Sequence, residues 1–187
     1  MASPVGHSLA AVAAGWLVAP PPQTRTALVI QMATLAAIGV MPDLDLLIGR
    51  HSAETHSIGV AAIVASVAAL LRVPVASQRW RIWLAIFLAW MTHPLLDAFT
   101  EDSSVPIGIM VWWPFSSAYF HSGVTIFDSI YRRWWLPGFW EHNLKAALKE
   151  LVILAPPFAA VAWITLRRTN RIPVRFSVRD DRRPPSA

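Results

Sequence analysis

The sequence predicts an all-α integral membrane protein, a bundle of about five helices with an additional segment at the outer membrane surface. Of its 187 residues, 55% are hydrophobic and only 14% are charged, and the mean hydropathy is +0.46. Soluble domains usually contain about 25% charged residues. A bilayer is therefore the simplest solvent for this chain, and the alternative is a soluble bundle of fully buried helices.

Five apolar runs bounded by Pro, Arg or acidic residues predict the helices. They span residues 8–19, 26–41, 57–71, 82–99 and 151–166. Each run is shorter than the roughly 20 residues that cross a hydrocarbon core, so some crossings must include flanking polar residues. No basic residue precedes the first run, so we expect no cleavable signal and a first helix that is retained.

The end of the chain differs in composition from the rest. We predict that residues 1–166 form the helical bundle and that residues 167–187 form a disordered, basic cytoplasmic tail. Its arginines stand among Pro and Ser and are Arg167, Arg168, Arg171, Arg175, Arg179, Arg182 and Arg183. Such a tail can bind anionic lipid or RNA, but it lacks interleaved aromatic residues, so no nucleic-acid partner is expected.

Positive charge in the short connections predicts the topology. Arg25 lies between the first two runs, and Arg72, Arg79 and Arg81 lie between the third and fourth. Short basic connections remain cytoplasmic, which places the N-terminus outside and the C-terminal tail inside. The start of the first helix, the second connection, the end of the fourth helix and residues 101–149 should then share the outer face of the inner membrane.

The long outer segment carries an apolar pattern of its own. Apolar residues at helical spacing within residues 126–135 predict an amphipathic helix that lies on the bilayer and covers the outer face as a lid. Several tryptophans in the same segment, including Trp112, Trp113 and Trp140, are typical of interfacial anchors.

Most of the histidines and several aspartates fall on this same outer face. They are His7, Asp43, Asp45, His51, His56, His93 and Asp97. The chain has no cysteine, so a metal here must be bound by nitrogen and oxygen donors, which suits Zn, Mn or Mg. Individually these residues are equally well explained as helix caps or interfacial groups. Their joint placement favours a metal site.

Local spacing supports this interpretation. His93 and Asp97 are four residues apart and share one helix face, either as metal ligands or as a buried hydrogen-bonded pair. Pro42 should end the second helix and turn Asp43 and the carboxylate that follows it toward a common centre. We expect Thr55 to cap the third helix and the neighbouring serine, residue 57, to hydrogen-bond a ligand.

These motifs resemble those of the YdjM-like family of predicted membrane-bound metal-dependent hydrolases. Its members share an N-terminal His and the elements PDxD, HRGxTHS, HxxxDxxT and WPFS. Here those elements are residues 3–8, 42–45, 51–57, 93–100 and 113–116. The resemblance covers about the first 120 residues, in the expected order. The chain departs from it at Ser52 and Ala53, which replace Arg and Gly.

The family is distantly similar to zinc-dependent phospholipase C and to single-strand-specific zinc nucleases, which are helical phosphodiesterases. The resemblance implies a hydrolase that binds a divalent metal, foremost Zn, as one or two ions, with five ligands: His7, Asp43, His56, His93 and Asp97. Asp45 and His51 are candidate catalytic residues, and the alternatives are further ligands or groups that hold a water or a ligand imidazole. His121, Asp128, Glu141 and His142 are candidates for a second metal or for substrate binding, or else exposed interfacial groups.

An active site at the bilayer surface would face lipid head groups. We therefore expect a phosphoesterase whose partners are membrane lipid and a small-molecule or lipid-linked phosphate. Two other functions use the same residues: a metal or proton transporter, and a noncatalytic scaffold whose closed metal site ties helices together.

Overall fold

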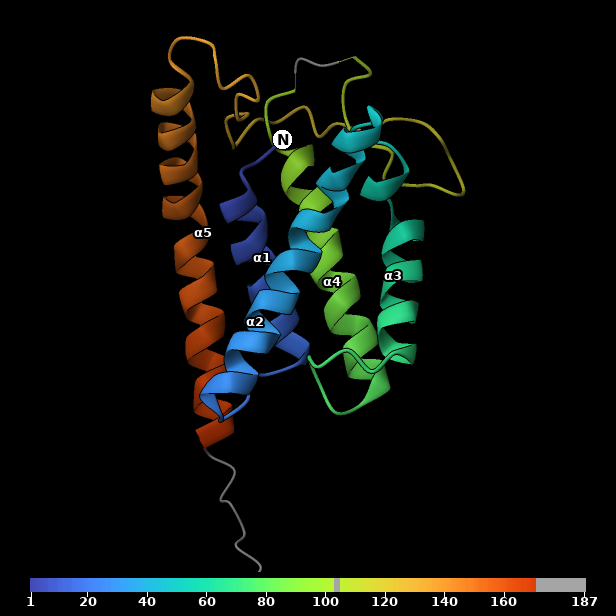
Figure 1. Ribbon diagram of the computed structural model, residues 1–187, viewed down its shortest axis with the longest axis vertical. Coiled ribbons are helices and arrows are strands. Elements are labelled where there is room, and N and C mark those ends of the chain that lie inside the picture. Colours follow the sequence, from blue (N-terminus) through green and yellow to red (C-terminus); the bar gives the residue numbers. More distant parts are fainter. Residues whose placement is uncertain (103–104, 171–187) are drawn as a thin grey trace, which may run out of the picture.

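Five α-helices build the computed structural model, which describes residues 1–102 and 105–170 (Figure 1). They are α1 (Pro4–Val18), α2 (Arg25–Val40), α3 (Ile58–Leu70), α4 (Arg79–Ala98) and α5 (Phe139–Asn170). Two short 3-10 helices, η1 (Met41–Ile48) and η2 (Glu54–His56), lie between α2 and α3. Within the described residues, β-structure is limited to isolated bridges. The predicted all-α class is confirmed, and each of the five predicted apolar runs overlaps one of the α-helices.

Helices α1 and α4 form the centre of the bundle. Helix α1 packs against α2, α4 and α5, while α4 also packs against α2 and α3. Small residues permit the close approach of α1 and α2, since a methyl group at Gly15 would overlap Leu35 and one at Gly39 would overlap Ala11. Close contact between small residues is a common way for helices to associate in a bilayer.

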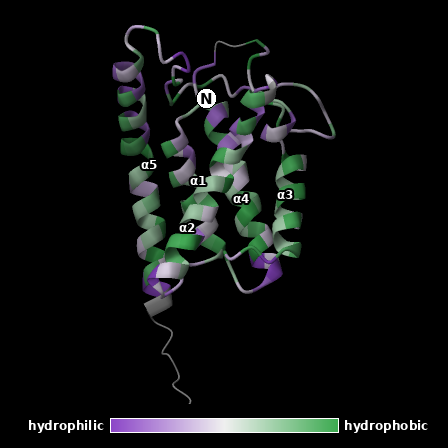
Figure 2. Cartoon of the chain, viewed as in Figure 1, coloured by the Kyte–Doolittle hydropathy of each residue, from purple (hydrophilic) through white to green (hydrophobic). Residues whose placement is uncertain are grey.

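Among the described residues, two helical stretches are long and apolar enough to cross a membrane, Arg25–Leu47 and Phe139–Arg168, and two shorter helices, Pro4–Val18 and Ile58–Leu70, are also apolar. Within the part of the chain that the structure describes, helix α5 packs against α1 and against no other helix, and it exposes large apolar side chains, including Val152, which is 73% exposed. Hydrophobic residues fill the middle of the bundle and hydrophilic residues gather at its ends (Figure 2). This distribution suits helices surrounded by lipid.

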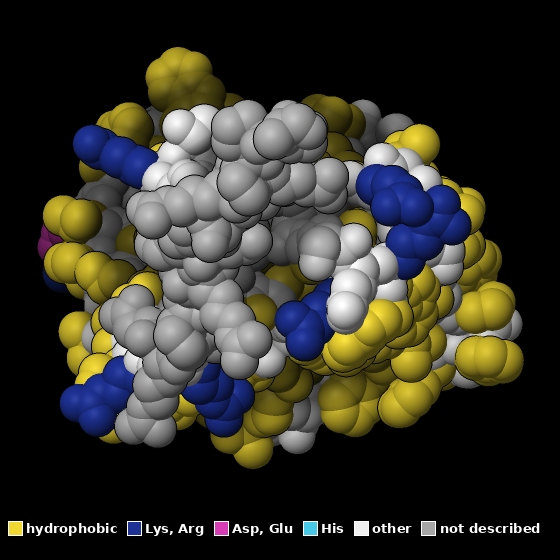
Figure 3. All heavy atoms as spheres, turned by 90° about the horizontal axis from the view of Figure 1, so that it is seen from below, with side chains coloured by type: hydrophobic (Ala, Val, Ile, Leu, Met, Phe, Trp, Pro, Cys, Tyr) yellow, Lys and Arg dark blue, Asp and Glu magenta, His cyan; other side chains and the backbone are white. Residues whose placement is uncertain are grey.

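Basic residues surround the end of the bundle that is opposite the N-terminus. Arg25 begins α2, Arg72 follows α3, Arg79 begins α4, and Arg167 and Arg168 lie in the last turns of α5. Figure 3 views this end and shows Lys and Arg side chains around it. Helix α5 thus continues past residue 166, the predicted end of the bundle, to Asn170, and the rest of the predicted tail lies outside the described residues.

The amphipathic helix predicted within residues 126–135 is wrong. Phe127 forms a bridge with Thr100, its carbonyl accepts the Glu101 N–H (3.0 Å), and its side chain is buried. The Tyr131 N–H donates to the side chain of Asn143 (2.7 Å). Because these backbone groups are paired with distant residues, they are not free for helical hydrogen bonds, and tertiary contacts override the periodic pattern. The segment nevertheless crosses the N-terminal end of the bundle (Figure 1).

Candidate metal centre

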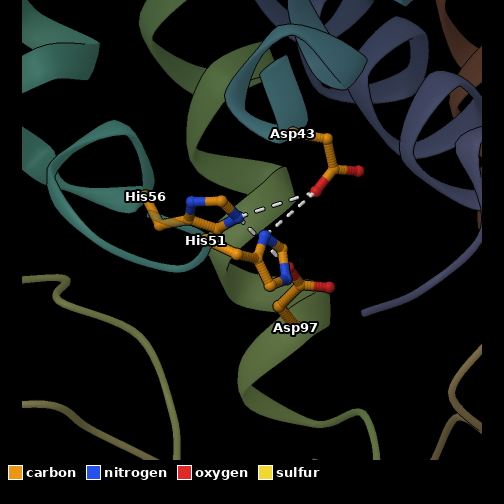
Figure 4. A group of neighbouring side chains, drawn as sticks. All are labelled: Asp43, His51, His56 and Asp97. Carbon is orange, nitrogen blue, oxygen red and sulfur yellow. Dashed lines mark ion pairs between the residues drawn. The ribbon is translucent and has the colours of Figure 1, made fainter. Parts of the chain in front are cut away.

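All seven predicted site residues meet at the N-terminal end of α1, between α1, α4 and the two 3-10 helices. His7 comes from α1, the two aspartates 43 and 45 from η1, His56 from η2, and His93 and Asp97 from α4. His51 lies in the turn between η1 and η2 (Figure 4). Three separate stretches of the chain, around residue 7, residues 43–56 and residues 93–97, therefore supply one buried polar cluster.

Helix η1 places two carboxylates on the cluster. Pro42 stands at its beginning, where a missing N–H costs nothing, and Gly49 ends it in the left-handed conformation (φ 69°). Within this tight helix the side chains of Asp43 and Asp45 are 9% and 2% exposed. The predicted break at Pro42 is therefore a change from α-helix to 3-10 helix, and it turns both carboxylates inward.

His56 and His93 face each other through their Nε2 atoms, which are 3.1 Å apart. The Nδ1 atom of His93 lies 2.7 Å from the carbonyl oxygen of Gly39, an acceptor, and so must carry the proton. The Nδ1 atom of His56 lies 3.2 Å from a carboxylate oxygen of Asp45 and is protonated for the same reason. Each neutral imidazole then presents a lone pair at Nε2. Two lone pairs at this distance repel each other unless a cation lies beside them, either a proton on one of the Nε2 atoms or a metal ion.

Carboxylate oxygens complete this arrangement. Asp97 Oδ2 lies 3.4 Å from the Nε2 atoms of both histidines, 56 and 93, and Asp43 Oδ1 lies 3.3 Å from His93 Nε2 and 3.9 Å from His56 Nε2. Tetrahedral zinc with bonds of about 2.1 Å separates its ligand atoms by about 3.4 Å. These donors are thus spaced as ligands of one ion, and Asp97 Oδ2 and both Asp43 oxygens are buried without a hydrogen-bond partner.

His7 extends the cluster on the side of α1. It is fully buried, stacks on His93 (centroids 3.6 Å apart) and has no hydrogen-bond partner at either ring nitrogen. Its Nε2 atom lies 3.5 Å from Asp97 Oδ1. Two groups have donor atoms close enough to hold an ion: Asp43, His51, His56 and Asp97, and separately His7, His93 and Asp97. Asp97 belongs to both groups.

Asp45 orients two imidazoles rather than facing the centre of the cluster. Its Oδ1 lies 3.2 Å from His51 Nδ1 and its Oδ2 lies 3.2 Å from His56 Nδ1. Burial opposes a charged His56, but hydrogen bonds to Asp45 and Asp97 raise the pKa of His56 above its ordinary value. The carboxylates that stabilise an imidazolium here would stabilise a metal cation in the same place.

The roles predicted for Thr55 and Ser57 are exchanged in the structure. Thr55 donates its hydroxyl hydrogen to Asp45 Oδ2 (2.7 Å) and thereby orients the carboxylate. Ser57 caps α3 by accepting the Val60 N–H (3.2 Å). Both residue types cap helices and hydrogen-bond carboxylates, so only the position at which α3 begins distinguishes them.

The other candidate residues are engaged away from this cluster. His142 Nε2 donates to the Ser129 carbonyl (2.7 Å), Asp128 pairs with Lys149 and Glu141 with Lys145. His121 accepts the Gly123 N–H (3.1 Å). None of them belongs to either potential ligand group of the described residues, and each has a structural role in the outer segment.

Glu150 and Gly39 position the site, and the sequence did not single them out. Glu150 on α5 is 1% exposed, accepts the Ser3 N–H (2.7 Å) and also bonds the Ser3 hydroxyl. Ser3 in turn caps α1, which carries His7. The available signal for Glu150 was its position directly before the apolar run 151–166 of α5. Gly39 acts through its backbone carbonyl, which accepts the His93 Nδ1–H. Every residue has such a carbonyl, so the residue type gives no sign of this role.

A Gly39→Ala variant should weaken both folding and metal binding. The added methyl group would overlap the Cβ of Ala11 and come within 2.8 Å of the His7 carbonyl oxygen, so α2 must move away from α1. Overpacking of this kind costs roughly 1–3 kcal/mol, and the shift would displace the carbonyl that orients His93. Thermal unfolding and metal content in detergent measure both effects. Ala37→Val is the control, because it adds volume at an exposed position of α2, and it should change neither the thermal stability nor the metal content. Equal effects in the two variants would contradict this explanation.

Comparison with known proteins agrees with the membrane fold. The family model described as YdjM inner membrane protein matches residues 1–172, a range that contains all seven cluster residues and all five helices. No curated protein and no solved structure matches the chain. Because the match covers nearly the whole chain, the protein belongs to the YdjM inner membrane protein family.

Proposed function

We propose that this protein is a membrane-embedded, metal-dependent hydrolase, a phosphoesterase that acts on a lipid or lipid-linked phosphate. The observation that carries the proposal is the convergence of buried imidazole and carboxylate groups, among which both ring nitrogens of His7, both oxygens of Asp43 and Oδ2 of Asp97 have no hydrogen-bond partner. Such groups are costly to bury unless a cation compensates them. Nitrogen and oxygen donors at these separations favour Zn, with Mn or Mg as alternatives, and one or two ions.

A bound divalent ion would supply a water of lowered pKa and would polarise a phosphoryl oxygen. The residues around it divide the remaining tasks. His56 and His93 present Nε2 because their Nδ1 atoms are held by Asp45 and by the Gly39 carbonyl. Asp97 belongs to both groups of potential ligands and so fixes their positions relative to each other.

His51 is the residue best placed to move a proton. Its Nδ1 atom is held by Asp45 Oδ1 (3.2 Å), and among the described residues its Nε2 atom has no hydrogen-bond partner. The side chain is 16% exposed and lines a cavity of about 310 Å³. An imidazole oriented by a carboxylate and accessible to a cavity is the usual arrangement of a general acid or base. In this proposal Asp45 is a positioning residue.

The position of the cluster supports a lipid-borne substrate. The cluster lies at one end of helices whose apolar surfaces suit a bilayer, so its opening is near the depth of phospholipid head groups. The basic side chains at the opposite end of the bundle favour that end as cytoplasmic. We therefore propose that the site faces the outer side of the inner membrane and that the C-terminus is inside.

Metal content and hydrolysis, measured on the same detergent-purified samples, test this function. We expect about one or two zinc ions per chain and hydrolysis of a soluble phosphate ester or of a phospholipid, both lost in His93→Ala. Bound metal without hydrolysis of any phosphate ester would instead favour a metal-stabilised scaffold or a transporter. A wild-type protein that retains no divalent metal after purification in zinc would rule out the site.

A further inference from the structure

A cavity of about 310 Å³ opens beside the metal centre, and it combines cationic and aromatic side chains. Its walls include Arg50, His51, Tyr119 and Arg132, together with the carboxylate of Asp102. His51 is shared with the cluster, where it faces Asp43 and Asp45. A molecule in this cavity would therefore lie within reach of His51 of the cluster and of two guanidinium groups.

We propose that this cavity is an anion subsite that holds the phosphate group of the substrate, with Arg132 as its principal cation. The inference rests on the proposed function and adds the substrate class, an ester with a terminal phosphate group. Guanidinium groups bind phosphate oxygens through paired, charge-assisted hydrogen bonds. Two arginines at one cavity next to divalent-metal ligands are suited to a group that carries two negative charges.

Arg132 is available for such a contact. Its side chain is exposed, and no carboxylate of the described residues lies within ion-pair distance of it. It also lines a second cavity of about 510 Å³, together with Tyr131 and Arg133. Arg132 therefore stands where the two cavities adjoin.

Arg50 forms an ion pair with Glu54 that a bound phosphate could replace. Its Nη2 atom lies 2.7 Å from Glu54 Oε1, and the two side chains are 61% and 35% exposed. Exposed pairs of this kind contribute little to stability, so a dianionic phosphate can replace the Glu54 carboxylate. The other acidic group at the cavity, Asp102, already accepts the Gly108 N–H (2.8 Å), which partly satisfies its charge.

These contacts predict that two substitutions change the affinity for phosphate in opposite directions. Arg132→Gln should weaken binding of inorganic phosphate to the zinc-loaded protein by roughly tenfold, because one charge-assisted contact is lost. Glu54→Gln should strengthen it, because Arg50 loses its competing carboxylate. Arg133→Gln removes an equal charge from the adjacent residue, which lines the second cavity but not the first, and should have little effect.

The measurement is isothermal titration of inorganic phosphate into the full chain in nanodiscs of phosphatidylcholine, with zinc content checked in every variant. Glycerol phosphate and nanodiscs doped with phosphatidic acid distinguish a soluble ester from a lipid as the source of the phosphate. Equal losses in Arg132→Gln and Arg133→Gln, or no phosphate binding by the zinc-loaded wild type, would overturn the subsite. Phosphate binding that depends on Arg132 without hydrolysis of any ester would retain the subsite and reject the hydrolase. Zinc-dependent hydrolysis that is unchanged in Arg132→Gln would retain the hydrolase and reject the subsite.

Discussion

Asp97→Asn should remove every metal ion from the protein and abolish its metal-dependent hydrolysis. Asp97 is common to both groups of potential ligands, and its Oδ2 lies 3.4 Å from the Nε2 atoms of both His56 and His93. Loss of a group that only orients a ligand typically costs roughly 10–100-fold in metal affinity. Loss of a ligand that two groups share should reduce metal affinity by more than this. Zinc content after dialysis against a weak chelator measures the effect.

Two comparisons make this result specific. His7→Gln alters only the group that His7 forms with His93 and Asp97, so it should lose part of the metal if two ions are bound. Asp128→Asn removes an exposed carboxylate that pairs with Lys149 and should retain all of it. Full zinc occupancy in a folded, monodisperse Asp97→Asn protein would show that the buried cluster is not the metal site.

His51→Gln should separate turnover from metal binding. If His51 transfers a proton while Asp45 holds its Nδ1 atom, the variant keeps its zinc but loses hydrolysis by roughly 10²–10⁴-fold, the usual contribution of a general acid or base. Zinc content and kcat on a soluble phosphate ester measure both.

The competing role for His51 is that of a direct ligand, since its Nδ1 atom is also 3.8 Å from Asp43 Oδ1. In that case His51→Gln would lose zinc in parallel with activity. Asp45→Asn provides the matched test. It should reduce metal affinity moderately by freeing the His56 imidazole, and it should lower turnover further by freeing His51.

Periodic and compositional patterns predicted most of the architecture. All five apolar runs coincide with helices because a bilayer, like a protein core, requires each segment to satisfy its own backbone. The same reasoning failed for residues 126–135, where apolar spacing was present but Phe127 and Tyr131 pair their backbone groups with Glu101 and Asn143. Partners so distant in the sequence leave no trace in a local pattern.

The sequence by itself determined the helical class, the inventory of seven His and Asp residues and the end of the bundle at which they meet. These follow from hydropathy, from alternating connections and from the high cost of ionisable groups in apolar segments. Only the tertiary structure decided which atoms face one another: His56 against His93, Asp97 between two groups, and Asp45 behind two imidazoles. It also revealed Gly39 and Glu150, whose roles depend on a carbonyl and on a cap contributed by other helices. Residue types specify which donors are present, but their directions depend on how closely the helices pack.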